Sequence, residues 1–122
     1  MYRLSVLTAA VVALAVAGSA AAHPKLISAS PTANATVAIP AHVELHFSET
    51  LMPAFSKADL TMAAMPGMTA MKMASVATVG ADGRTLVVTP QASLAPRRYS
   101  VDWHVVSTDT HKVAGSYAFT VK

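Results

Sequence analysis

The chain has 122 residues, of which 53% are hydrophobic and only 12% are charged, and it contains seven Met, five His and no Cys. Its 9 Lys and Arg against 6 Asp and Glu make it weakly basic, and the basic residues are scattered. Nothing in this distribution indicates a nucleic-acid-binding stripe or an anchor to an anionic membrane. The absence of Cys excludes disulfides and every metal or redox site that needs a thiolate.

The N-terminus carries the pattern of a secretory signal. Residues 6–17 (VLTAAVVALAVA) form an apolar run that follows the basic Arg3 and leads into small residues that end at Ala22. This run is shorter than the roughly 20 residues that a membrane-spanning helix needs. We therefore expect residues 1–22 to be a signal peptide that is cleaved after Ala22. The exported chain, residues 23–122, would not insert into a membrane.

The exported chain has the alternation of β-strands. Residues 42–47 place Val43, Leu45 and Phe47 on one face, and residues 99–105 repeat this pattern. The predicted strands, in chain order, are residues 25–30, 42–47, 57–62, 75–79, 86–88, 99–105 and 117–121.

Turn residues and prolines separate these strands, and no amphipathic helix of ten or more residues appears. About seven short strands spaced by turns predict an all-β fold, either a sandwich or a small barrel with Greek-key connections. The chain has no internal repeat and no linker, so we expect a single domain over residues 23–122.

Cleavage would make His23 the first residue, with a free α-amine and an imidazole. Together these two groups can chelate a metal, because the amine loses its proton near neutral pH. Pro24 has no amide N–H, so the backbone amide that follows His23 is not available as a further copper ligand. Other ligands must come from elsewhere in the fold.

Asp109 and His111 are the leading candidates for these ligands. They lie two residues apart, so on an extended segment their side chains point the same way. A nitrogen-rich set with one carboxylate is typical of Cu(II). Glu49 follows the strand 42–47 and is a possible additional carboxylate. His42, His46 and His104 lie on the polar faces of their strands, and we interpret them as surface residues.

The segment 62–73 contains five of the seven methionines. They are Met62, Met65, Met68, Met71 and Met73. Methionine also packs well in cores, but this window contains no Leu, Ile or Phe, and Pro66-Gly67 interrupts any helix. A loop that presents only thioethers is suited to Cu(I), because soft sulfur ligands select it. The two predicted sites together indicate a protein that binds copper in both oxidation states.

With these residues the sequence resembles the bacterial CopC family of periplasmic copper-resistance proteins. The resemblance extends over the whole exported chain. It is carried by residues 23–26 (HPKL), 44–49 (ELHFSE), 65–68 (MPGM), 99–103 (YSVDW), 106–111 (VSTDTH) and 115–116 (GS).

This resemblance implies a cupredoxin-like Greek-key β-barrel with two copper sites. It implies Cu(II) ligation by the amine and ring of His23 together with Asp109 and His111, and Glu49 matches a further ligand proposed in some members. It also implies a Cu(I) site in the methionine loop. This chain has Ala70 near the position where some members carry a loop His, so its Cu(I) site would use thioethers alone.

Three functions follow as hypotheses. The first is a non-enzymatic copper carrier or buffer in the periplasm, which passes copper to an inner-membrane copper transporter or a periplasmic multicopper oxidase. The second is a copper-dependent polysaccharide monooxygenase, which also uses an N-terminal His paired with a second His. The third is a structural or adhesive β-sandwich whose His and Met residues are incidental.

Overall fold

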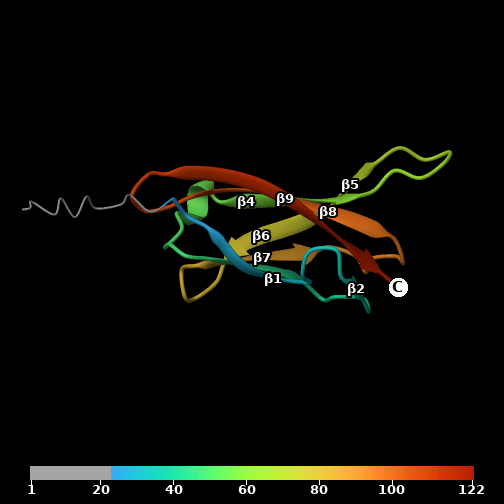
Figure 1. Cartoon of the computed structure of the whole chain (residues 1–122), viewed down its shortest axis with the longest axis horizontal. Coiled ribbons are helices and arrows are strands. Elements are labelled where there is room, and N and C mark those ends of the chain that lie inside the picture. Colours follow the sequence, from blue (N-terminus) through green and yellow to red (C-terminus); the bar gives the residue numbers. More distant parts are fainter. Residues whose placement is uncertain (1–22) are drawn as a thin grey trace, which may run out of the picture.

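The computed structural model describes residues 23–122, and the predicted signal peptide lies outside these residues. Two β-sheets pack face to face (Figure 1). One sheet has four strands in the order β1-β3-β7-β6, and the other has five in the order β2-β9-β8-β4-β5. The strands pair antiparallel except for β2 and β9, which are parallel.

The bounds of the described elements follow the chain. They are β1 Leu26–Ser30, β2 Thr36–Val37, β3 Val43–Phe47, the 3-10 helix η1 Pro53–Phe55, β4 Lys57–Met62, β5 Met71–Met73, β6 Ser75–Val79, β7 Thr85–Pro90, β8 Arg98–Val106 and β9 Lys112–Val121. No helix among residues 23–122 is long and apolar enough to cross a membrane.

The all-β prediction is confirmed, and each of the seven predicted segments overlaps a strand. The prediction missed β2 and β5, because elements of two and three residues are too short to display alternation. The two sheets remain separate rather than closing into one barrel, so the architecture is a sandwich. The chain crosses between the sheets, since β1 pairs with β3 whereas the intervening β2 pairs with β9.

The core lies between the sheets and is built by the predicted inward faces. On β3, Val43, Leu45 and Phe47 are at most 2% exposed. On β8 the alternating residues are buried as well, whereas the residues between them face outward. The buried positions of β8 are Tyr99, Val101, Trp103 and Val105. Alternation with a period of two therefore predicted the core correctly.

The two predicted groups of copper ligands lie at opposite ends of the sandwich. Figure 1 shows the start of β1 beside the turn between β8 and β9 at one end. The loop between β4 and β5, which carries methionines, extends from the other end, where β9 and the chain terminate. Each group must therefore be considered as a separate site.

Candidate metal centres

The segment that begins at His23 is held against the end of β3. The backbone N–H of Lys25 donates to Ser48 Oγ over 2.9 Å, and the N–H of Ser48 donates to the carbonyl of Lys25 over 2.9 Å. Pro24 is buried. These contacts anchor the two residues that follow His23, so its exposed side chain has a defined starting point next to the sheet.

The turn between β8 and β9 presents Asp109 and His111 at the same end. The N–H of Ser107 donates to the carbonyl of His111 over 3.0 Å, and the N–H of Thr110 donates to the carbonyl of Ser107 over 2.8 Å. Thr110 closes the turn with a φ of 72°. The hydroxyl of Ser107, a residue only 1% exposed, donates to the Asp109 carboxylate. The buried Ser107 hydroxyl therefore orients the Asp109 carboxylate within the turn.

The imidazole of His23 packs against that of His111. Their ring centroids are 4.9 Å apart at an interplanar angle of 80°. His111 Nδ1 lies 3.0 Å from Asp109 Oδ2. The structure thus brings together three predicted ligands from the two ends of the described chain.

The nitrogen His111 Nδ1 has unused bonding capacity. It is shielded from solvent and, despite the short distance to Asp109, it has no aligned hydrogen bond with the described residues. The hydrogen bond from Ser107, and after it the His111 side chain, hold the pKa of the Asp109 carboxyl below its ordinary value. An ionised carboxylate beside an imidazole nitrogen that makes no aligned hydrogen bond is an arrangement suited to a cation.

His23 contacts His111, and His111 contacts Asp109, but the three side chains do not surround a common point. Within residues 23–122 no three His, Asp or Glu side chains surround one point closely enough to hold a metal. In the full-length chain the nitrogen of His23 is a peptide amide, which is not a metal donor at neutral pH. A complete site would therefore need the free amine of a cleaved chain and a rotation of the His111 and Asp109 side chains. These side chains are 30% and 46% exposed, which leaves room for such a rotation.

Glu49 lies near this end without joining the pairs. The N–H of Thr108 donates to the carbonyl of Thr50 over 3.0 Å, and Leu51 forms a bridge with Ser107. These contacts bring the Glu49 backbone alongside the turn. Its carboxylate forms no hydrogen bond or ion pair with the described residues. A role for Glu49 as a ligand stays a prediction.

The remaining histidines have surface partners. His42 Nε2 and His46 Nε2 lie 3.1 and 3.3 Å from the Glu44 carboxylate, and His46 Nδ1 lies 3.0 Å from Thr85 Oγ1. His104 is exposed on the outer face of β8, opposite Lys57. All three therefore lie at the surface, on the polar faces that the alternation predicted.

The methionine segment folds into a hairpin. Met62 pairs with Met71 across β4 and β5. Further out, the N–H of Met65 donates to the carbonyl of Met68 over 2.9 Å, and the reverse bond measures 2.8 Å. Gly67, with a φ of +81°, closes a two-residue turn in a conformation that side chains rarely adopt. Residues paired in this way project their side chains on the same face.

The five methionines divide into two groups. Met65, Met68 and Met71 are 47%, 45% and 52% exposed. Met62 is 8% exposed within the core, and Met73 is half-buried against it. Packing accounts for Met62 and Met73, whereas the other three thioethers are presented to solvent. All five were predicted as Cu(I) ligands, and only the exposed three are free of the core.

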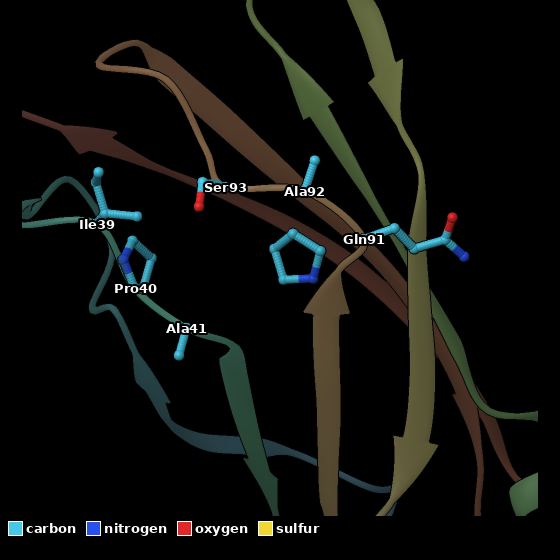
Figure 2. A pocket seen from close by; sticks show the side chains of 7 residues that line it. Ile39, Pro40, Ala41, Gln91, Ala92 and Ser93 are labelled. Atoms are coloured by element: carbon cyan, nitrogen blue, oxygen red, sulfur yellow. The ribbon is translucent and has the colours of Figure 1, made fainter.

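A separate pocket of about 370 Å³ lies between the loop after β2 and the loop after β7. Figure 2 shows Ile39, Pro40 and Ala41 on one side and Gln91, Ala92 and Ser93 on the other. All the residues that line it are uncharged. It contains neither His nor Met, so it offers none of the donors that the two candidate centres present.

A protein-family model described as the CopC domain matches residues 26–122. The chain belongs to the CopC family. Among its relatives is Copper resistance protein C of Xanthomonas campestris pv. juglandis, which is 48% identical over 124 residues that cover 99% of this chain and 98% of that protein. The protein of the same name from Pseudomonas syringae pv. tomato is 47% identical over 98% of this chain and 97% of its own length.

Solved structures agree with this membership. The crystal structure of PcoC, a methionine-rich copper resistance protein from Escherichia coli, matches with a TM-score of 0.77 and 44% identity, covering 83% of this chain and 100% of that one. CopC from Methylosinus trichosporium OB3b matches with a TM-score of 0.71 and 33% identity, covering 82% and 94%. The resemblance to CopC proteins and the all-β fold expected from the sequence are therefore confirmed.

Sequence reasoning did not find how two residues support the candidate Cu(II) centre. Ser107 donates to Asp109, and Pro24 is buried next to His23. Ser107 stands two residues before Asp109, a spacing at which a hydroxyl and a carboxylate commonly meet in a turn, and this signal could have found it. Arg97, which lies against the methionine hairpin, had no such signal, because its contact spans 29 residues.

Proposed function

We propose that this protein is a copper-binding protein of copper resistance that acts as a carrier or buffer. Its membership of the CopC family supports copper as the bound ion. The observation that carries the proposal is the approach of the His23 and His111 rings to 4.9 Å beside the Asp109 carboxylate. Nothing in the local sequence requires this contact, and it brings near one another side chains of the types that suit Cu(II).

In this proposal the Cu(II) centre forms after export. Removal of residues 1–22 would give His23 a free amine, which adds a fourth donor to the two imidazoles and the carboxylate. Glu49 is the further ligand of the set. The location is the periplasm, where a signal peptide would deliver the chain.

A second centre for Cu(I) is the methionine hairpin. Met65, Met68 and Met71 supply exposed thioethers, and the backbone pairing of Met65 with Met68 holds two of them on one face. Neutral sulfur ligands favour the soft monovalent ion. From these two centres copper would pass to an inner-membrane copper transporter or a periplasmic multicopper oxidase.

The carrier is favoured over a copper-dependent monooxygenase. A terminal imidazole paired with a second imidazole would suit such an enzyme, but in the proposed centre the Asp109 carboxylate beside His111 would take a coordination position that oxygen needs. Trp103 and Tyr99 are 8% and 0% exposed, so these two rings belong to the core and not to a flat surface that would bind a polysaccharide.

The experiment compares the protein that begins at His23 with one that carries a single Gly before it. We expect the first to gain about 2.7 kcal/mol of stability with Cu(II) at 100 times its dissociation constant, and the second to lose most of this gain. Thermal unfolding with and without Cu(II) measures the difference.

Two further variants complete this experiment. Asp109→Ala combined with His111→Ala should abolish the Cu(II) shift. His104→Ala removes an exposed imidazole from the outer face of β8 and should leave the shift intact. An equal Cu(II) shift in the protein with the added Gly would disprove the terminal-amine centre.

A further inference from the structure

The guanidinium of Arg97 lies directly against the methionine hairpin. Its Nη1 donates to Met68 Sδ over 3.9 Å, and its Nη2 donates to the carbonyl of Ala63 over 3.3 Å. It therefore contacts one of the exposed thioethers and also the residue at which the hairpin leaves β4. A cation is therefore held at one of the sulfur atoms that the Cu(I) centre would use.

The backbone fixes the origin of this side chain. The carbonyl of Arg97 accepts from the N–H of Val121 over 2.8 Å, and the next carbonyl, that of Arg98, accepts from the N–H of Ala63 over 2.8 Å. Arg97 thus stands at the junction of β4, β8 and β9. Its position depends on the sandwich and not on the conformation of the hairpin.

No carboxylate neutralises this cation. Arg97 forms no ion pair with the described residues, and the neighbouring guanidinium of Arg98 binds the neutral side-chain oxygen of Asn34 over 3.1 Å. A groove of about 320 Å³ separates the hairpin from the end of β9. Both arginines and Met65 line this groove, and no acidic residue does. Met65 and Met68 therefore lie beside a guanidinium that no carboxylate among the described residues neutralises.

We propose that Arg97 sets the affinity of the methionine hairpin by opposing the bound ion. This inference rests on the proposed Cu(I) centre and deepens it. While the hairpin is metal-free, the guanidinium donates to Met68 Sδ. When Cu(I) binds this sulfur, the guanidinium repels the ion, and the neutral thioethers supply no negative charge to offset this repulsion. The result is a centre that binds Cu(I) more weakly than the same sulfurs would alone, which suits a carrier that must release its ion.

The size of the effect follows from charge and distance. Two unit charges about 4 Å apart in water interact with about 1 kcal/mol, which is about fivefold in affinity. The hydrogen bond to sulfur is long and the one to Ala63 is near the limit of length, so their loss has a smaller influence than the loss of the charge. We therefore expect removal of the charge to strengthen Cu(I) binding, even though the two hydrogen bonds are lost with it.

The test measures the Cu(I) dissociation constant of the chain that begins at His23, by competition with a chromophoric Cu(I) chelator under reductant. Arg97→Gln removes the charge and keeps an amide donor, whereas Arg97→Lys keeps the charge. We expect Arg97→Gln to bind Cu(I) about fivefold more tightly and Arg97→Lys to stay within about twofold of the parent. Arg84→Gln removes the same charge from the turn before β7 and serves as the matched control.

Salt dependence separates an electrostatic role from a structural one. Raising ionic strength from about 0.01 M to about 1 M shortens the Debye length from about 30 Å to about 3 Å, so it should tighten Cu(I) binding by the parent and leave Arg97→Gln nearly unchanged. Weaker or equal binding by Arg97→Gln at low salt would overturn the proposal, as would equal weakening by both variants. A parent protein that binds no Cu(I) would instead refute the methionine centre itself.

Discussion

Two hydroxyl groups that are shielded from solvent differ in their hydrogen bonding: Ser107 Oγ has a partner, whereas Tyr117 Oη has none among the described residues. Ser107 donates to Asp109, and this bond is the largest cause of the lowered pKa of that carboxyl. Tyr117 Oη is cut off from solvent and has no hydrogen-bond partner among the described residues. Burial raises the pKa of the Tyr117 phenol to about 12. Ser107 therefore orients a predicted ligand, whereas the Tyr117 hydroxyl makes no contact that would offset its burial.

Replacing Tyr117 with Phe should stabilise the protein. The ring stays packed against the core while an unsatisfied hydroxyl, which typically costs about 1–3 kcal/mol, is removed. We expect a gain of about 1 kcal/mol at pH 7, measured by urea unfolding. The pKa of the Tyr117 phenol is higher in the folded than in the unfolded protein. Its ionisation therefore leaves the free energy of unfolding unchanged below pH 10 and lowers it as the pH rises towards 12. Tyr117→Phe should remove that alkaline loss.

Tyr99→Phe is the matched control for this prediction. The hydroxyl of the buried Tyr99 donates to the carbonyl of Ala95 over 2.8 Å, so its removal takes away a hydrogen bond that is made in the folded state. This variant should be less stable than the parent. If Tyr117→Phe is destabilised to the same extent, the Tyr117 hydroxyl has a partner in solution and the prediction is wrong.

At the scale of elements, the hairpin of β8 and β9 depends on one close contact. Gly115 faces Trp103 across the pair, and the indole lies over the glycine. A Cβ atom at Gly115 would be 2.3 Å from Trp103 Cζ2. The indole also packs edge-on against Phe47 of β3, with ring centroids 5.1 Å apart, so it joins the two sheets.

Gly115→Ala should therefore destabilise the sandwich. The added methyl group must displace Trp103 or separate β8 from β9, and overpacking of this kind costs about 1–3 kcal/mol. For a domain of this size we expect a melting temperature lower by about 4–8 °C per kcal/mol, with a shift in the Trp103 fluorescence. Gly80→Ala is the control, since a Cβ there meets only ordinary contacts at 3.6 Å. Equal stability of the two variants would contradict this account.

At the scale of the whole molecule, the sandwich separates the two candidate copper centres. The His23 and His111 pair lies at one end, and the methionine hairpin extends from the other (Figure 1). Strands β4 and β8 run between these ends as rigid elements with a common core. The two centres share no residue, so we expect them to bind independently.

This independence predicts selective losses. Replacing Met65, Met68 and Met71 with Leu should abolish the Cu(I) thermal shift and preserve the Cu(II) shift, because leucine keeps the volume but lacks the sulfur. Asp109→Ala with His111→Ala should do the reverse. Met52→Leu, which removes a methionine outside the hairpin, should change neither. Loss of both shifts in the triple variant would mean that the centres are coupled.

Local patterns in the sequence were enough to predict the longer strands, their inward faces and the residue types that could bind copper. Alternation is a local property, so β3 and β8 were predicted from their own residues. The cluster of methionines and the absence of Cys are likewise visible without a fold. The short strands β2 and β5 were not visible, because their pairing with β9 and β4 creates them.

How these residues meet follows from packing between distant parts of the chain. The contact between His23 and His111 depends on the anchoring of the chain start against β3 and on the register of β8 with β9. The burial of Met62, the exposure of Met65 and the position of Arg97 depend on where the hairpin leaves the core. These are contacts between strands that are distant in the chain. Their geometry comes from strand register and packing, which no local pattern encodes.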